Sequence, residues 1–208
     1  MKKIISALFV LIMIATIINA QDYKRYQYKS GEIHYKVSGM TNGTEDIYFT
    51  DYGMKEAKID KTTMEMMGIK QSQNQKTVLD HNMTYVVDYD KKTVTKMETP
   101  MLSMFPKGTD LTKVGEEMMT NMGGKKVGTG TVLGKNCDIW EVQNLGSKIW
   151  IWNSIPMKTE TNIMGMSVTQ EATDVKVDVS VSDDHFEIPK NFKVQTMNQQ
   201  GNPMNFMK

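Results

Sequence analysis

The chain has 208 residues, of which 39% are hydrophobic and 24% are charged, and its formal net charge is +1. This length and balance fit one globular domain, and the near-neutral charge excludes the basic footprint that nucleic-acid-binding proteins carry. Cys137 is the only cysteine, so an internal disulfide is excluded, and the thiol is interpreted as a small buried apolar group.

The first twenty residues have the three parts of a secretory signal peptide. Lys2 and Lys3 precede an apolar stretch over 4–18, and Asn19-Ala20 lead into the polar sequence from Gln21. Fifteen residues of helix reach about 22 Å, short of the roughly 30 Å hydrocarbon core of a bilayer. We therefore expect a signal peptide over 1–20 that is cleaved between about Ala20 and Gln21, and a periplasmic or secreted product with no transmembrane segment in the mature chain.

Methionine is unusually frequent. Eighteen of the 20 methionines follow residue 20, whereas leucine occurs there at only five positions. Because methionine is unbranched and polarisable, it fills irregular space and adapts to varied apolar surfaces. The composition therefore favours a plastic core or an adaptable apolar cavity.

Alternating apolar and polar residues predict β-strands through most of the chain after residue 21. In the segment 31–37, Ile33, Tyr35 and Val37 share one face and polar residues occupy the other. Asn42-Gly43 is a strong turn signal. Further strands are predicted, in chain order, over 45–50, 54–60, 77–79, 83–89, 93–97, 126–133, 137–143, 148–152, 157–163 and 166–181.

One helix is predicted midway along the chain. Apolar residues recur from Leu111 to Met122 at three- and four-residue spacing, Asp110 or Thr109 can cap the start, and Gly123-Gly124 ends it. The loop between Pro100 and Pro106, just before this helix, is compatible with a helical turn.

These elements predict a mainly β (α+β) fold. We expect a single large, strongly curved antiparallel sheet, an open half-barrel, with one or two helices from the segment 100–124 covering its concave face. The single domain is expected over 21–190, followed over 191–208 by a polar tail rich in Met, Asn and Gln.

Several motifs resemble an uncharacterised bacterial family of exported proteins that looks related to the outer-membrane lipoprotein carriers and receptors. They are Gly134 ahead of Asn136-Cys137, the Lys148-Ile149-Trp150 strand that leads to Ile155-Pro156-Met157, and the closing Phe186-Glu187-Ile188-Pro189. The resemblance covers about residues 26–189. It implies a curved sheet whose helices close a hydrophobic cavity, which in the carriers holds acyl chains. The carriers' functional arginine has no evident counterpart, since the chain's one arginine, Arg25, precedes the first strand.

Enzymatic motifs are missing from the sequence. His34, His81 and His185 do not fall at metal-ligand spacing, there is no Gly-x-Ser-x-Gly, and neighbouring acidic pairs such as Glu116-Glu117 suit a solvated surface. We therefore expect neither an enzyme nor a cofactor.

Three functions remain open from the sequence. The first is an envelope protein that binds a lipid, an acylated protein or another apolar ligand in a methionine-rich cavity. The second is a Cu(I)-binding protein, because soft thioethers suit that ion. The third is a structural or interaction protein without a small ligand. The candidate cavity residues are Met101, Met104, Phe105, Leu111, Val114, Met118, Met122, Trp150 and Trp152, and the candidate Cu(I) ligands are Met64, Met66, Met67, Met118, Met119 and Met122.

Overall fold

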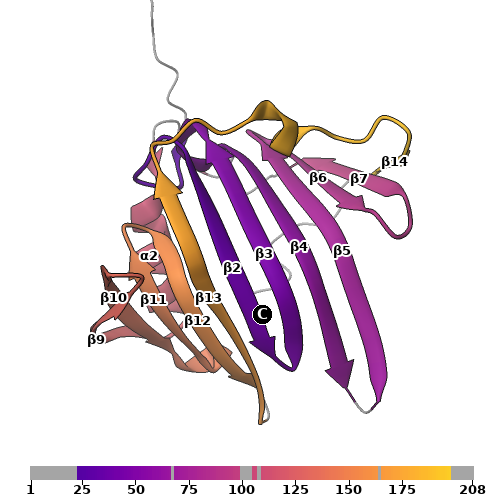
Figure 1. Cartoon of the computed structure of the whole chain (residues 1–208). Helices are drawn as coiled ribbons and strands as arrows, with labels where there is room; N and C mark the ends of the chain where they lie inside the picture. Colours follow the sequence, from indigo (N-terminus) through magenta and orange to yellow (C-terminus); the bar gives the residue numbers. More distant parts are fainter. Residues whose placement is uncertain (1–22, 67, 99–104, 107–108, 164, 198–208) are drawn as a thin grey trace, which may run out of the picture.

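The computed structural model describes residues 23–66, 68–98, 105–106, 109–163 and 165–197. Most of them belong to one open sheet of twelve strands in the order β14-β7-β6-β5-β4-β3-β2-β13-β12-β11-β10-β9 (Figure 1). The strands are β2 (Gly31–Gly39), β3 (Thr41–Thr50), β4 (Lys55–Met66), β5 (Ile69–Asp80), β6 (Met83–Asp88), β7 (Thr93–Glu98), β9 (Gly124–Val132), β10 (Lys135–Val142), β11 (Ser147–Trp152), β12 (Ile155–Ile163), β13 (Met166–Val177) and β14 (Lys193–Thr196).

The predicted fold class is confirmed: a large, curved, unclosed sheet carries one described α-helix, α2 (Leu111–Asn121). Every neighbouring pair of strands is antiparallel except β14 and β7, which are parallel. Three short 3-10 helices, η1 (Asp51–Gly53), η2 (Gln143–Leu145) and η3 (Asp183–Phe186), occupy connections. A separate two-residue parallel pairing joins β1 (Tyr23–Lys24) to β8 (Thr109–Asp110).

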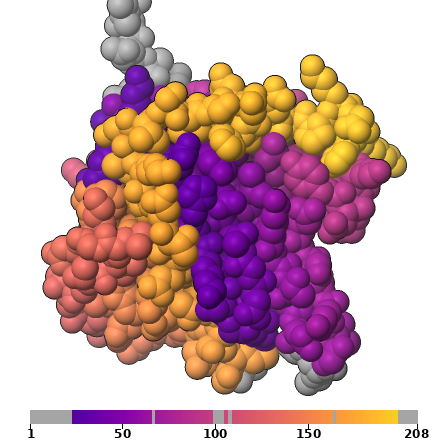
Figure 2. Space-filling view, in the orientation of Figure 1, coloured from indigo at the N-terminus to yellow at the C-terminus, as the bar shows by residue number. Residues whose placement is uncertain are grey.

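The two faces of the sheet are covered by different parts of the chain. Consecutive strand residues point to opposite faces, so in β4 Glu56 lies on the face under α2 while Ala57 lies on the other. Ala57, Val78 and Phe186 form a small buried cluster on that other face. Figure 2 shows the carboxyl-terminal segment, in yellow, lying across the upper end of the sheet.

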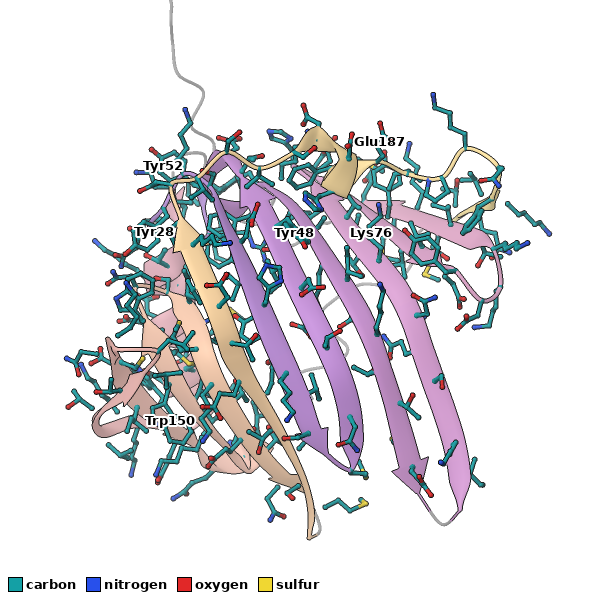
Figure 3. All side chains as sticks on the ribbon, in the orientation of Figure 1. Tyr28, Tyr48, Tyr52, Lys76, Trp150 and Glu187 are labelled. Carbon is teal, nitrogen blue, oxygen red and sulfur yellow. The ribbon has the colours of Figure 1, made fainter. Side chains whose placement is uncertain are left out.

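Lys76 holds the carboxyl-terminal segment down. Its ammonium group donates to the carbonyl oxygens of His185 at 3.3 Å and Glu187 at 2.6 Å. Figure 3 shows Lys76 beneath the segment that carries Glu187. Burial lowers the pKa of this ammonium group, and the two carbonyls replace the water that it loses. The segment then continues into β14 (Lys193–Thr196), which lies within 191–208, the range expected to form a polar tail.

The larger core lies over β3, β2, β13 and β12 in the middle of the sheet and continues onto β10 and β9. Ile33, Phe49, Cys137, Ile155 and Met157 have no exposed surface. Burial of so many strand side chains stabilises the sheet without disulfides, since each large apolar side chain contributes about 1.5–3 kcal/mol.

Asn42-Gly43 does not form the predicted turn. Both residues lie inside β3, and the chain reverses instead at Gly39-Met40. A Cβ atom at Gly43 would stand 2.1 Å from the carbonyl oxygen of Lys61, so glycine is required there for the close approach of β4. The Asn42 amide donates to the carbonyl oxygen of Gly39 at 2.8 Å and closes the actual turn.

Candidate functional site

A cavity of about 400 Å³ lies between α2 and the sheet face formed by β4, β5 and β6. Glu56, Leu79 and Thr84 share this face because they pair across the three strands in register. The apolar part of the wall is made by Leu79, Phe105, Leu111, Val114 and Met118, and the remaining lining residues are Arg25, Glu56, Thr77, Thr84 and Gly115.

Helix α2 turns its apolar stripe toward this cavity. The Asp110 carboxylate caps the helix by accepting from the Thr112 backbone N–H at 3.1 Å. Leu111, Val114 and Met118 then fall on one face and line the cavity, yet no residue of α2 is buried and Met118 is 42% exposed. An amphipathic helix normally buries such a stripe against a core, whereas the described residues of this stripe line the cavity.

Gly115 opens the cavity further. It lies in the middle of α2 and lines the cavity, and a Cβ atom built there would have no neighbouring atom within 4 Å. Glycine in a helix interior costs about 1 kcal/mol relative to alanine, and nothing in the packing around Gly115 requires glycine.

The polar end of the cavity is formed by Arg25, which follows β1. The guanidinium group contacts both oxygens of Glu56, with Nη1 at 3.1 Å from Oε2 and Nη2 at 3.2 Å from Oε1. Nη1 also donates to the carbonyl oxygen of Gly53 at 2.8 Å. Because β1 pairs with β8, and Asp110 of β8 caps α2, Arg25 connects the start of the helix to strand β4.

Tyr26 completes this polar network. Its hydroxyl donates to Glu56 Oε2 at 2.7 Å. Burial and then the Glu56 charge raise the pKa of the Tyr26 hydroxyl well above its ordinary value. Burial acts to lower the pKa of the Arg25 guanidinium group, but the charge and the hydrogen bond of Glu56 outweigh it and the pKa is raised. The guanidinium group is therefore charged and already paired, and with Glu56 it contributes no net charge to the wall.

The structure brings four of the nine candidate cavity residues together at this cavity: Phe105, Leu111, Val114 and Met118. Met101 and Met104 lie outside the described residues. Met122, the C-cap of α2, is not among the residues that line the cavity.

The two candidate tryptophans, Trp150 and Trp152, lie on β11 and are not among the residues that line the cavity. The Lys148 and Lys158 ammonium groups stand 5.5 Å and 5.2 Å from the Trp150 ring centroid, and the rings of Trp152 and Tyr28 lie 5.3 Å apart. Figure 3 shows Trp150 away from the carboxyl-terminal segment, at the side of β9–β12.

The thioether candidates for Cu(I) fall in two separate places. Met118 and Met119 belong to α2 and Met122 caps it, whereas Met64 lies on β4 opposite Gln71. The Met66 and Met67 side chains lie outside the described part of the structure. Of the methionines that the structure describes, Met118 alone lines the cavity, while Met54 and Met157 are buried in the core.

A second hollow of about 450 Å³ lies over β10–β13, and most of the residues that line it are of polar or charged type. Ser147 and Thr161 line it, with their hydroxyl oxygens 2.9 Å apart, and so do Glu141, Lys148 and Glu160. Charged and hydroxyl groups of this kind do not favour an apolar ligand. The cavity beneath α2 is therefore the candidate site.

Sequence reasoning missed Arg25, which follows β1, and Gly115 of the helix. It also missed the residues that the sheet contributes, namely Glu56, Thr77, Leu79 and Thr84. The alternation in 54–60 and 77–79 placed Glu56 and Leu79 on strands, but register alone shows that both lie under the helix. A glycine among the apolar positions of a predicted helix was the available signal for Gly115.

No histidine cluster or acidic cluster forms a metal centre in the described part of the chain. No helix among the described residues is both long and apolar enough to cross a membrane.

No protein-family model and no curated protein sequence matches this chain. An uncharacterized conserved protein from Thermus thermophilus matches in structure with a TM-score of 0.54 and 8% identity, over 82% of this chain and 92% of its own. The Pseudomonas aeruginosa MucA/MucB complex gives a TM-score of 0.50 and 13% identity, over 86% of this chain and 62% of the matched chain. The Mycobacterium tuberculosis lipoprotein LppX gives 0.39 and 11%, over 75% of this chain and 91% of its own. At such identities the first two matches show the fold alone.

Proposed function

We propose that this chain is a non-enzymatic binding protein of the cell envelope that holds an apolar ligand, such as an acyl chain, in the cavity beneath α2. The observation that carries the proposal is the apolar stripe of α2, which faces a cavity of about 400 Å³ and leaves Met118 exposed. A preformed, mostly apolar cavity with a few polar groups at one end is the usual form of a small-molecule site.

The signal-like sequence over 1–20 predicts export, and export supports a location in the cell envelope. The structural match to the Pseudomonas aeruginosa MucA/MucB complex, in which one protein is bound to another, supports a binding role as well. The family resemblance, which implies an acyl-chain cavity, points to the same function.

The polar end of the cavity favours a ligand whose own polar part is uncharged. Arg25 is held by both oxygens of Glu56, and Tyr26 donates to the same carboxylate. A ligand carboxylate would have to displace Glu56 to reach the guanidinium group, and that would leave a partly buried Glu56 charge without a partner. A hydroxyl, ester or amide group can bond at the rim of this network without that loss.

Native mass spectrometry of the protein purified from its own host tests the proposal, and a co-purifying acyl ligand is expected. Binding of the uncharged dye N-phenyl-1-naphthylamine then locates the site. Gly115→Leu places a side chain in the cavity and should weaken dye binding by about tenfold, the effect of losing roughly 1.4 kcal/mol.

Gly128→Leu is the matched control, because a Cβ atom at Gly128 also has no neighbour within 4 Å and this residue lies on the edge strand β9, away from the cavity. Equal dye binding by the two variants, together with a ligand-free protein, would overturn the proposal and favour an interaction protein without a small ligand.

A further inference from the structure

One row of paired residues connects the cavity to the last strand of the sheet. Residues that pair across neighbouring strands share one face, and the pairing of β4, β5, β6 and β7 joins Glu56, Leu79, Thr84 and Met97 in turn. The first three of these residues line the cavity. The row therefore leaves the cavity and reaches β7 on the same face of the sheet.

Met197 continues this row beyond β7. Strand β14 pairs with β7 in parallel (Figure 1), with Thr196 opposite Lys96, and the Met197 backbone N–H donates to the carbonyl oxygen of Lys96 at 2.8 Å. The same register places Met197 beside Met97, and its side chain is 54% exposed. The segment 198–208 therefore begins in the row of residues that leads to the cavity.

The cavity lies within reach of this segment. Neighbouring strands are about 4.8 Å apart, so the three spacings from β14 to β5 place Met197 roughly 14 Å from Leu79. An extended chain spans about 3.3 Å per residue, so the seven residues that lead from Met197 to Met204 reach roughly 23 Å. The segment can return across β7 and β6 without any rearrangement of the sheet.

The composition of the segment suits such a return. Gly201-Asn202-Pro203 is a turn signal, and Met204, Phe206 and Met207 follow it. Residues 198–207 carry no charged side chain, so the segment can lie beside the ion pair at the polar end of the cavity without displacing either partner.

We propose that the segment 198–208 docks Met204 and Phe206 in the cavity beneath α2, on the side formed by Leu79 and Thr84, and so competes with the apolar ligand. The competition rests on the proposed function, whereas the docking requires only the cavity. A segment joined through a short linker acts at a concentration on the order of 1 mM, so even weak docking competes with a free ligand.

Binding of N-phenyl-1-naphthylamine to the full chain measures the competition. The variant that combines Met204→Ser, Phe206→Ser and Met207→Ser should bind the dye about tenfold more tightly than the unaltered chain, the change expected when roughly nine-tenths of the chains hold the segment docked. Adding Gly115→Leu should remove this gain, which places the gain in the cavity.

The matched control combines Asn198→Ser, Gln199→Ser and Gln200→Ser. It alters three residues of the same segment ahead of the turn and keeps the apolar side chains, so it should bind the dye like the unaltered chain. Equal dye affinity of the apolar variant and the unaltered chain would overturn the proposal.

Cross-linking with a short bismaleimide tests the docking without any ligand. Leu79→Cys combined with Phe206→Cys should cross-link within one chain at several times the yield of Asp80→Cys combined with Phe206→Cys. Asp80 is the next residue of β5 and faces the other side of the sheet, so a segment that does not dock would reach both positions alike. The native Cys137 has no exposed surface and does not interfere.

The outcomes separate the docking from the proposed function. Preferred cross-linking at residue 79 in a protein that binds no dye in any variant would support the docking and refute the ligand site. Equal cross-linking at residues 79 and 80 would overturn the docking and leave the ligand site standing. Cross-links between two chains would overturn it as well, by assigning the cavity to the segment of a second copy.

Discussion

Arg25 and Glu56 form a two-pronged ion pair across 31 residues of chain, with nitrogen–oxygen distances of 3.1 Å and 3.2 Å. Glu56 comes from strand β4, and Arg25 comes from the segment that leads into the sheet. The Arg25 side chain is 30% exposed and that of Glu56 is 12% exposed, so water screens the pair weakly. Arg25 is the chain's single arginine, and the planar guanidinium group fits a carboxylate in a way that lysine does not.

Replacing Arg25 with alanine should lower the free energy of unfolding by about 2–4 kcal/mol, because Glu56 would remain partly buried without its cation. Urea denaturation measures the change. Lys24→Ala is the neighbouring control: the Lys24 ammonium group lies 4.6 Å from the Tyr52 ring centroid, and such a contact contributes about 0.5–1 kcal/mol. Equal losses in the two variants would show that the Arg25–Glu56 pair has no special role.

Gly115→Ala should raise the free energy of unfolding by about 1 kcal/mol, because alanine favours the helix and meets no neighbour at this position. Gly124→Ala should have the opposite effect, since its Cβ atom would stand 2.5 Å from the carbonyl oxygen of Met119. Thermal and urea unfolding of both variants measure whether the free energy of unfolding rises in Gly115→Ala and falls in Gly124→Ala. Loss of stability in Gly115→Ala would mean that the space beneath α2 is filled.

Glu45 should make stability depend on pH. Burial raises the pKa of its carboxyl group, an effect that the Lys58 ammonium group at 2.8 Å opposes and Asp60 reinforces. A carboxyl group with a raised folded pKa contributes fully below its unfolded pKa of about 4.3, and that contribution is lost as the pH rises through the folded value.

Glu45→Gln removes this titration. The stability of the variant relative to the unaltered chain should therefore increase between about pH 4 and about pH 7. Melting temperatures of both proteins across this range provide the measurement. A difference that stays constant, or one that shrinks as the pH rises, would contradict the raised pKa.

Cys137 should be unreactive until the protein unfolds. Its side chain has no exposed surface, and burial raises the pKa of the thiol, so little reactive thiolate forms. Thiol labelling with a disulfide reagent should be slow in buffer and complete in denaturant. Thr129→Cys, which puts a thiol on the exposed edge strand β9, should label promptly at one site per chain. Fast labelling of the unaltered folded chain would contradict the burial of Cys137.

The elements with regular patterns could be predicted from sequence. Helix α2 was predicted from the spacing of Leu111, Val114 and Met118 and from the Asp110 cap, and most strands were predicted from alternation. The first half of β5 was missed, because residues 70–76 are all polar. These residues are mostly exposed, so neither face there selects apolar side chains. Strand β14 is four exposed residues long and gives no alternation to detect.

The candidate site was predictable only from the helix side. Phe105, Leu111, Val114 and Met118 come from one segment, and a local pattern revealed three of them. Arg25, Glu56 and Leu79 meet only because β1 pairs with β8 and β4 pairs with β5 in a particular register. Register depends on contacts between distant segments, which one sequence read locally does not specify.

The pairing of β2 with β13 places the first long strand of the sheet beside the last one before the carboxyl-terminal segment. The Thr173 hydroxyl donates to the carbonyl oxygen of His34 across 139 residues of chain. The middle of the sheet, where the larger core lies, therefore closes only after nearly the whole chain has been synthesised. Closing so long a loop costs entropy before it returns any contacts, and topologies dominated by such pairings fold slowly. Until β13 arrives, the edge of β2 that will pair with it has no partner, and an unpaired strand edge is a template for aggregation.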